Sequence, residues 1–450
     1  MPANRKAIWW GTAGALLVFV ITVVLASSVL TVWDKGKVPA GSSVAGIPLG
    51  GLTYQEARYR LARELPGRTG SYLAFRGAGK TCTVPCKDCH LRLDIDGSLR
   101  QCLGGSQSGL RGVLFHAVVR GKSLDYPAVF RWDNESVEKV IEQIRPVFEV
   151  AAQNARIILK NDTLEYIPHQ PGRRIDEKQT LQRLEQVLHK GRLGPVEVAF
   201  MTVSPLVKLE DINEVRDVLG VYVTTFDPRQ QARTTNMRLA AGAVDGTIVM
   251  PGQVFSLDET LGPRREENGY RRAPVFAANR VVRDLGGGIC QVATTLYNAA
   301  LQAGLEIVER RPHSRPITYV PLGQDATIVA NMYDLKFRNN TGSPILLAMS
   351  LTDNQLMARI FGCQLDNGKK IRLVTERQEI QPRVEVRYRP DLPEGTRTVK
   401  QQGRKGYRVK TYRIVSQDGQ DVERTLLSQD YYPPVNTIIV VGPNYPGEKK

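Results

Sequence analysis

The longest hydrophobic stretch of the chain lies at its amino terminus. No charged residue interrupts AIWWGTAGALLVFVITVVLASSVLTVW at 7–33, and a stretch of this length can cross a bilayer with some tilt. Trp9, Trp10 and Trp33 flank it, where indole rings favour the lipid headgroups. We predict that residues 1–37 form a cytoplasmic tail and a transmembrane anchor of a single-pass cell-membrane protein whose bulk is extracytoplasmic. A cleaved signal peptide is the alternative.

The next segment, 38–208, mixes helical and strand patterns. Thr53 and Glu56 have the spacing of a capping box in front of a helical apolar stripe. Further elements follow in this order: a helix at 133–144, a hairpin around 161–162 and a helix at 175–191. We therefore predict small units of mixed α/β type in this segment.

After residue 219 the pattern changes twice. From 219 to 362, short β-prone runs are broken by glycine, proline and asparagine, with a single strong helix in the middle. From 370 to 442, polar and apolar residues alternate as they do in half-buried strands, and we predict that the tail at 443–450 is loose. The predicted fold class is α+β: an N-terminal membrane helix, mixed α/β small units, an α+β domain at 219–362 and a C-terminal β-rich domain.

The charge of the chain favours a polyanionic partner. Its net charge is +16 and its pI is about 9.6, which suits nucleic acid, anionic lipid or acidic wall polymers. We find no helix-turn-helix, zinc-finger or aromatic-basic single-strand signature. With the body exported, we predict no nucleic-acid partner and instead contacts with the membrane and with peptidoglycan or an anionic wall polymer.

A cluster of cysteines lies within 82–102. The segment TCTVPCKDCH followed by DGSLRQC holds Cys82, Cys86, Cys89 and Cys102. Two local disulfides fit an exported protein, four thiolates around zinc fit the spacing, and CKDCH matches the attachment motif of a c-type haem with His90 as the axial ligand. Disulfides are the favoured interpretation, the metal and haem interpretations stay open, and no cofactor is predicted.

The most distinctive stretch is GGGICQVATTLYNAALQAG, which places Cys290 at the first turn of the predicted helix. At 100° per residue, Ile289 and Leu296 belong to one apolar stripe, whereas Cys290 shares an intermediate flank with Thr294. Free N–H groups and the positive end of the helix dipole stabilise a thiolate in that position. The glycines let a ligand carboxylate approach the backbone. The predicted ligand-binding residues are Gly286, Gly287, Gly288, Gln291 and Thr294.

Two downstream residues complete a candidate relay. The loop RPHSRPITYVPLGQDAT offers His313 as a base and Asp325 as the group that orients it, so Cys290, His313 and Asp325 are the candidate catalytic residues. Three alternatives stay open: Cys290 fills space in a core, it pairs with Cys363, or His313 is bonded only to loop backbone.

Residues 219–362 closely resemble the VanW family, which is named from a vancomycin-resistance gene cluster. GGGICQ and TTLYNAAL carry this resemblance, with Ala293 standing where serine is expected and Asp258 where asparagine is usual. Residues 38 to about 206 resemble the peptidoglycan-binding domain that accompanies VanW in exported proteins, through VAGIPLGGLTYQEA and GRRIDEKQTLQRL with VEVAF. The C-terminal piece resembles the five-glycine domain of wall-associated proteins. Its candidate glycines are Gly395, Gly403, Gly406, Gly419 and Gly442.

The resemblance implies a bacterial envelope protein, of a Gram-positive type of cell, and does not fix a reaction. We predict a membrane-anchored protein that binds peptidoglycan or an associated wall polymer. The alternative is a cysteine enzyme that transfers or hydrolyses an acyl group of wall peptide through Cys290, His313 and Asp325. A third hypothesis is a redox or metal-carrying factor that uses the cysteine cluster.

Overall fold

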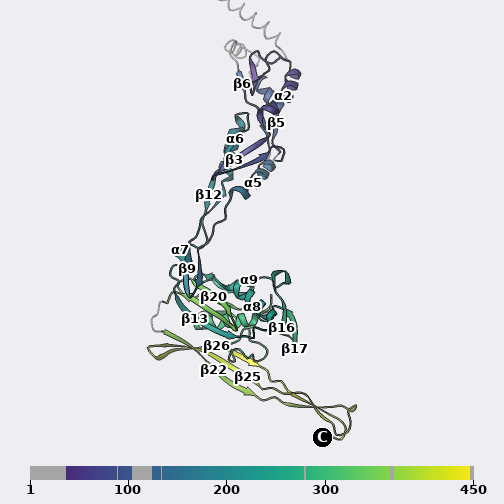
Figure 1. Ribbon diagram of the computed structural model, residues 1–450, viewed down its shortest axis with the longest axis vertical. Helices are drawn as coiled ribbons and strands as arrows, with labels where there is room; N and C mark the ends of the chain where they lie inside the picture. Colours follow the sequence, from purple (N-terminus) through teal and green to yellow (C-terminus); the bar gives the residue numbers. More distant parts are fainter. Residues whose placement is uncertain are drawn as a thin grey trace, which may run out of the picture. The chain divides into compact units, whose positions relative to one another are not determined.

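The computed structural model describes residues 37–88, 90–103, 124–132, 134–277, 280–364 and 369–445. The chain divides into two compact units, Met1–Gln153 with Pro171–Pro205, and Asn154–Gln170 with Leu206–Lys450 (Figure 1). The predicted membrane span at 7–33 lies outside the described residues. Within the described ranges, no helix is both long and apolar enough to cross a membrane.

One core of the first unit packs two helices against a small sheet of order β2-β1-β6. Helix α2 (Tyr54–Thr69) begins at the predicted capping box, in which the Glu56 N–H donates to Thr53 Oγ1 and the Thr53 N–H donates to Glu56 Oε2. Leu61 and Leu65 of this helix are fully buried. The other elements here are β1 (Ser42–Val44), β2 (Ile47–Pro48), β5 (Arg92–Asp94), α3 (Ile95–Leu103), β6 (Leu124–Tyr126) and β7 (Val129–Arg131).

The other core of the first unit centres on a sheet of order β11-β3-β4, with one helix on β4 and another on β11. Phe75 and Phe148 are its largest fully buried side chains. Helix α6 begins after Asp176, whose side chain accepts the Gln179 N–H at 2.9 Å. The elements are β3 (Tyr72–Gly77), β4 (Lys80–Pro85), α5 (Asn134–Phe148), β10 (Gly172–Ile175), α6 (Glu177–His189), β11 (Pro195–Glu197) and β12 (Phe200–Val203).

Among the described cysteines of the first unit, Cys82 and Cys102 are not disulfide-bonded. Cys82 packs against the core around β3 and Cys102 belongs to the core around α2, so the two do not pair with each other. His90 is exposed in a turn at φ 56°. No group of three or more potential ligands among the described residues is arranged to hold a metal ion. Cys89 lies outside those residues, so the zinc and haem hypotheses stay predictions.

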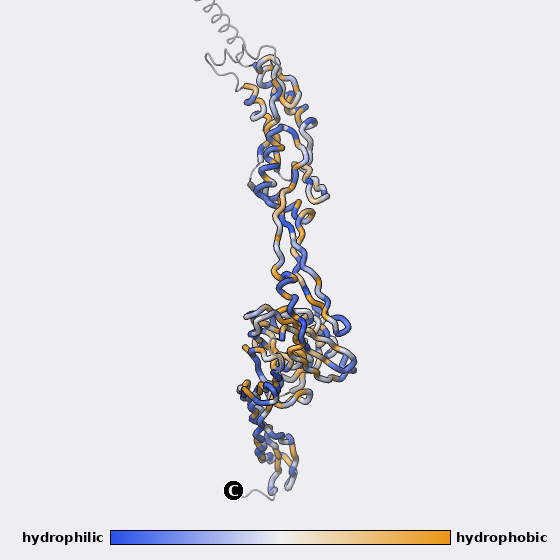
Figure 2. Tube along the Cα trace, turned by 90° about the vertical axis from the view of Figure 1, so that its left-hand side faces the viewer, coloured by the Kyte–Doolittle hydropathy of each residue, from blue (hydrophilic) through white to orange (hydrophobic). Residues whose placement is uncertain are grey.

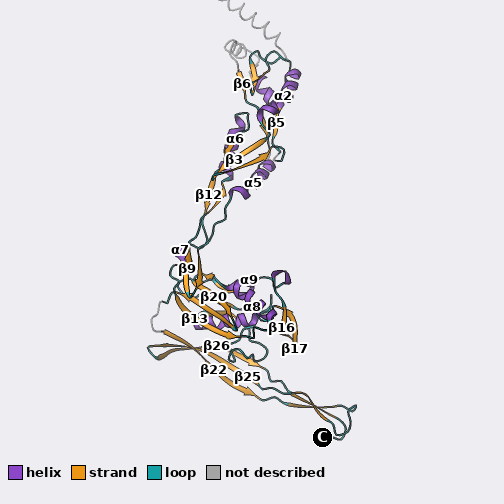
Figure 3. Ribbon diagram, in the orientation of Figure 1, coloured by secondary structure: helices purple, strands orange, loops and turns teal. Residues whose placement is uncertain are grey.

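The second unit begins with a hairpin and surrounds its main core with two sheets. Asn161 and Asp162 take φ values of 49° and 61°, the left-handed turn expected of the predicted hairpin between β8 (Arg156–Lys160) and β9 (Thr163–Ile167). Helix α10 (Ile289–Gln302) contacts β13 and β21. Helix α8 (Gln231–Val244) contacts α10 and β20, and Figure 3 shows α8 beside β20.

The strands of this core are arranged in two sheets and a hairpin, in the orders β13-β21-β20-β14, β15-β19-β18 and β16-β17. The strands are β13 (Asp217–Thr225), β14 (Thr247–Val249), β15 (Val254–Ser256), β16 (Arg272–Ala277), β17 (Arg280–Leu285), β18 (Glu306–Glu309), β19 (Lys336–Arg338), β20 (Ile345–Thr352) and β21 (Gln355–Gly362). The short helices are α7 (Leu209–Ile212), α9 (Leu257–Leu261) and the 3-10 helix η1 (Glu266–Asn268).

The C-terminal part is made of strands, as the alternation predicts. Hydrophilic and hydrophobic positions are interspersed along it (Figure 2). Two three-stranded sheets have the orders β22-β25-β26 and β23-β27-β24. The strands are β22 (Lys369–Ile380), β23 (Val384–Tyr388), β24 (Arg397–Gln401), β25 (Gly406–Gln417), β26 (Gln420–Tyr432) and β27 (Thr437–Val441).

Candidate thiol site

The three glycines before α10 serve close packing inside the protein. Gly288 is the N-cap residue at φ 110°, which a residue with a side chain rarely adopts. A Cβ at Gly287 would lie 2.8 Å from the Pro274 carbonyl oxygen, and one at Gly288 would lie 2.9 Å from Arg233 Cγ. Strand β16 and helix α8 therefore fill the space beside these two glycines. The predicted ligand contact at Gly286, Gly287 and Gly288 stays a prediction, but this packing is sufficient to require two of the three glycines.

Helix α10 is buried on almost all sides, so its polar side chains form hydrogen bonds with neighbouring segments of the protein. Gln291 Nε2 donates to Thr224 Oγ1 and to the Thr225 carbonyl oxygen, both at 2.9 Å. Thr294 Oγ1 donates to the Ala326 carbonyl oxygen and accepts the Ala326 N–H, both at 3.0 Å. Gln291 and Thr294 are only 1% and 0% exposed. Both residues predicted to bind a ligand thus hold α10 to its neighbours.

The structure brings Cys290, His313 and Asp325 together. His313 Nδ1 lies 2.7 Å from Asp325 Oδ2, and the His313 backbone N–H donates to the same oxygen at 2.6 Å. The imidazole also interacts with the Cys290 side chain, whose Sγ donates to the Ile328 carbonyl oxygen at 3.7 Å. Because Nδ1 is held by the carboxylate, Nε2 is the ring nitrogen that remains for the sulfur. Cys290 and Cys363 are not disulfide-bonded, so the alternative that they pair is not supported.

Electrostatics favours the charged forms of all three groups. Burial raises the pKa of the Cys290 thiol, but the hydrogen bond and charge of His313 outweigh burial and lower this pKa below its ordinary value. Burial lowers the pKa of His313, but hydrogen bonds to Asp325 and Cys290 raise it to about 9. Burial raises the pKa of Asp325, yet His313 and Arg310 bring it below its usual range. These shifts favour a thiolate beside an imidazolium.

Two further side chains lie in the electrostatic environment of the thiol. Arg233 of α8 donates to Gln291 Oε1 at 2.7 Å, and its positive charge helps lower the pKa of Cys290. Burial and the charge of Cys290 raise the pKa of Tyr319, whose hydroxyl also forms a hydrogen bond with Thr294. Tyr319 is therefore a neutral phenol beside the sulfur. The residues predicted from sequence included neither Arg233 nor Tyr319, because no local pattern connects them with Cys290.

Asp325 is fixed from its far side. Its carboxylate is 1% exposed, and Arg310 Nη2 lies 3.3 Å from Oδ1. Arg310 Nε also donates to the Asp325 carbonyl oxygen at 2.6 Å, and the guanidinium lies over the Tyr297 ring at 5.3 Å. These partners stabilise the ionised form of the buried carboxylate and also fix its orientation. In the sequence, only its position three residues before His313 could have indicated that Arg310 belongs to the site.

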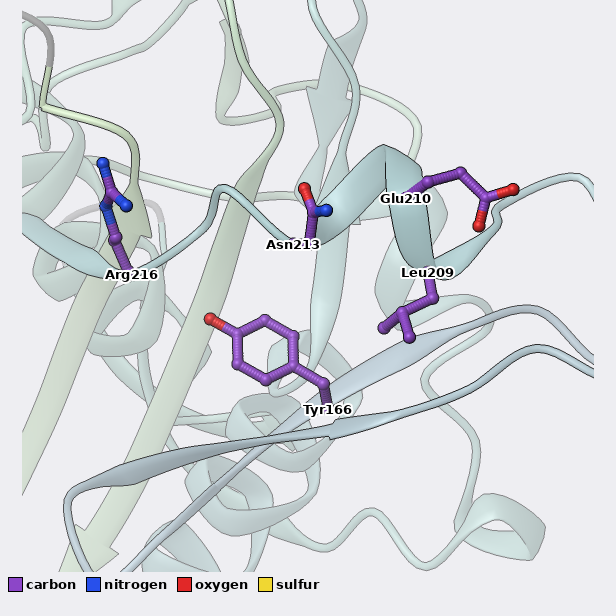
Figure 4. Close-up of a pocket in the computed structure, with 5 residues that line it drawn as sticks. All are labelled: Tyr166, Leu209, Glu210, Asn213 and Arg216. Carbon is purple, nitrogen blue, oxygen red and sulfur yellow. The ribbon is translucent and has the colours of Figure 1, made fainter.

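A separate open pocket of about 490 Å³ lies beside α7 and β9. It is lined by Tyr166, Leu209, Glu210, Asn213 and Arg216, and Figure 4 shows the Glu210 carboxylate pointing away from the Tyr166 ring. The Tyr166 hydroxyl donates to the Val215 carbonyl oxygen at 2.5 Å. These five residues include no thiol or imidazole, so the thiol site holds the stronger nucleophile.

Family comparisons agree with the three predicted resemblances. The model described as "VanW like protein" matches residues 232–361, that of the "G5 domain" matches 371–444, and that of the "Putative peptidoglycan binding domain" matches 83–197. The isolated structure of a G5 domain from IgA1 protease is 34% identical over 16% of this chain and 88% of its own, with a TM-score of 0.16.

Two full-length relatives extend this result. The vancomycin B-type resistance protein VanW of Enterococcus faecalis is 28% identical over 137 residues, which are 29% of this chain and 50% of that protein. The uncharacterized protein YoaR of Bacillus subtilis is 30% identical over 238 residues, which are 53% of this chain and 78% of YoaR. On this coverage and on the matching family model, the chain belongs to the VanW family.

Proposed function

We propose that this protein is a wall-associated thiol enzyme that cleaves or transfers an acyl group of wall peptide. The observation that carries the proposal is that Cys290, His313 and Asp325 interact in series, with 2.7 Å between His313 Nδ1 and Asp325 Oδ2. Each of these three buried or half-buried groups has a pKa shift that favours its charged form. Such a set is typical of an activated nucleophile.

The reaction follows from the charges of the three groups. The Cys290 thiolate attacks the carbonyl carbon of an amide, and the electron pair of the carbonyl moves to its oxygen. His313 then gives its proton to the leaving amine as the C–N bond breaks, which leaves a thioester on Cys290. Water or a second amine attacks the thioester, His313 takes up the proton of that attacking group, and the thiolate leaves. Asp325 holds the imidazole in orientation throughout.

The companion domains support the wall as the location of the substrate. Family models for peptidoglycan binding and for the G5 domain match on both sides of the thiol site in sequence. The net charge of +16 favours anionic polymers. In this proposal the stretch at 7–33 anchors the protein as a single-pass membrane protein, and the rest of the chain is extracytoplasmic. Binding to peptidoglycan or wall polymer then serves to bring the thiol to its peptide.

A trapping experiment tests the proposal. The purified protein is incubated with soluble fragments of peptidoglycan, quenched in acid, digested and analysed by mass spectrometry. We expect an acyl adduct on the Cys290 peptide and new free amino groups in the fragments. A Cys290→Ser variant should show neither, while Cys363→Ser should behave as the unaltered protein. No adduct and no new amines from the unaltered protein would contradict the proposed chemistry and leave binding as the function.

A further inference from the structure

The last residue of β26 reaches the far side of the thiol site. The Tyr432 hydroxyl donates to Asp325 Oδ1 at 2.5 Å and accepts the Gly323 N–H at 3.0 Å. Its side chain is fully buried. Tyr432 lies within the region that matches the G5 model, whereas Asp325 lies within the region that matches the VanW model. A buried hydrogen bond therefore joins the two family regions at the carboxylate that holds His313.

A second residue of the same strand face supports the same carboxylate indirectly. Side chains two positions apart in a strand share a face, so Asp430 lies beside Tyr432 while Tyr431 between them is 54% exposed. Asp430 Oδ1 accepts from Arg310 Nη1 at 2.6 Å, and Arg310 in turn contacts Asp325. Asp430 and Arg310 are each 5% exposed in their side chains. Strand β26 thus supplies both a hydroxyl and an anion to the buried network around Asp325.

The packing between the sheet and the loop is close. Gly323 takes φ 83°, and a Cβ there would lie 2.4 Å from Thr411 Oγ1 of β25. That hydroxyl donates to the Gly323 carbonyl oxygen at 3.2 Å. Arg413 of the same strand donates to the Gly304 carbonyl oxygen at 3.0 Å. These contacts fix the C-terminal sheet against the loop that carries Asp325 and against the end of α10.

We propose that Tyr432 is a positioning residue of the thiol site, so that the C-terminal domain completes a site whose nucleophile belongs to the VanW domain. This inference rests on the proposed function. Without the hydroxyl, Asp325 Oδ1 keeps only the 3.3 Å contact with Arg310, and a buried carboxylate with fewer donors is less stable in its charged form. The carboxylate is then no longer held in its orientation toward His313, so it supports the imidazolium less, and the thiolate loses part of its counter-charge.

The test is the pH dependence of Cys290 alkylation by iodoacetamide, followed by mass spectrometry of its peptide. In the unaltered protein we expect the rate to rise at a pH below that of an ordinary thiol. In Tyr432→Phe we expect this rise at higher pH, with a rate about five- to tenfold lower at pH 6 and unchanged at pH 10, where ordinary thiols are ionised. A purely structural effect on access would change the rate at both pH values.

Two further variants complete the experiment. Tyr431→Phe, on the exposed face of the same strand, should overlay the unaltered profile. Gly323→Ala should move the profile in the same direction as Tyr432→Phe, because its methyl group separates the loop from β25 while Tyr432 stays intact, and it serves if the Phe variant does not fold. A Tyr432→Phe profile that overlays the unaltered one, or moves to lower pH, overturns this inference alone. An ordinary thiol profile in the unaltered protein overturns the proposed function as well.

Discussion

Two buried environments give the same side chain opposite character. Cys102, near the end of α3, is 1% exposed among apolar residues, and burial raises its pKa to about 11. Cys290, at the first turn of α10, experiences the same effect of burial, but His313 and its carboxylate partner reverse it. Burial alone makes a thiol inert, whereas burial beside a fixed cation makes it a nucleophile. The comparison shows that a charged partner reverses the direction in which burial moves the pKa of a cysteine.

The largest expected effect is the difference in reactivity between these two thiols. In the native protein at pH 7, a thiol with a pKa of about 11 is ionised to about one part in ten thousand. Because the pKa of Cys290 lies below that of an ordinary thiol, we expect iodoacetamide to label Cys290 at least ~100-fold faster than Cys102. The measurement is a time course with both peptides quantified in the same digest. In urea the labelling rates of the two cysteines should become similar. Labelling rates of the native protein that differ by less than tenfold would contradict the proposed difference between the two thiols.

Removal of the imidazole should make Cys290 resemble Cys102. In His313→Ala the thiol keeps its burial but loses the hydrogen bond and charge that lower its pKa. We expect its labelling rate at pH 6 to fall about 100-fold because the pKa of the thiol rises, and to recover at alkaline pH. His169→Ala is the matched control, because His169 accepts the Leu209 N–H at a distance of 3.1 Å and takes no part in the thiol site. A fall in both variants would exclude a specific role for His313.

Local patterns were sufficient to predict much of the fold. The capping box at Thr53 and the turn at Asn161-Asp162 form as their sequences require, because each depends on residues within four positions. Cys290 and His313 were also named as partners from their chemical types and from a position at a helix start. The structure brings them together, and their catalytic role stays a prediction.

Long-range contacts account for what the sequence could not show. Tyr432 reaches Asp325 across 107 residues, and nothing near Tyr432 in sequence marks it as a member of the thiol site. Gln291 and Thr294 have polar side chains typical of a surface or a ligand site, yet each is paired inside the core by segments distant in sequence. Disulfides were expected because four cysteines cluster in a chain predicted to be exported, but Cys82 and Cys102 pack in different cores.

The smallest expected effect concerns the stability of the first unit. Replacing Cys102 should lower this stability, whereas replacing Cys290 should not. Cys102→Ser places a hydroxyl in an apolar core, but the Ser98 carbonyl oxygen, 3.9 Å from the sulfur, offers an acceptor. We therefore expect the free energy of unfolding of the first unit to fall by about 1–2 kcal/mol. Urea unfolding followed by Trp132 fluorescence, with Trp9, Trp10 and Trp33 replaced by Phe, measures it. Cys290→Ser should leave this transition unchanged, because Cys290 belongs to the second unit. An unchanged unfolding transition in Cys102→Ser would show that the buried thiol contributes nothing to its core. Cys102 would then not be a packing residue, in contradiction to the comparison.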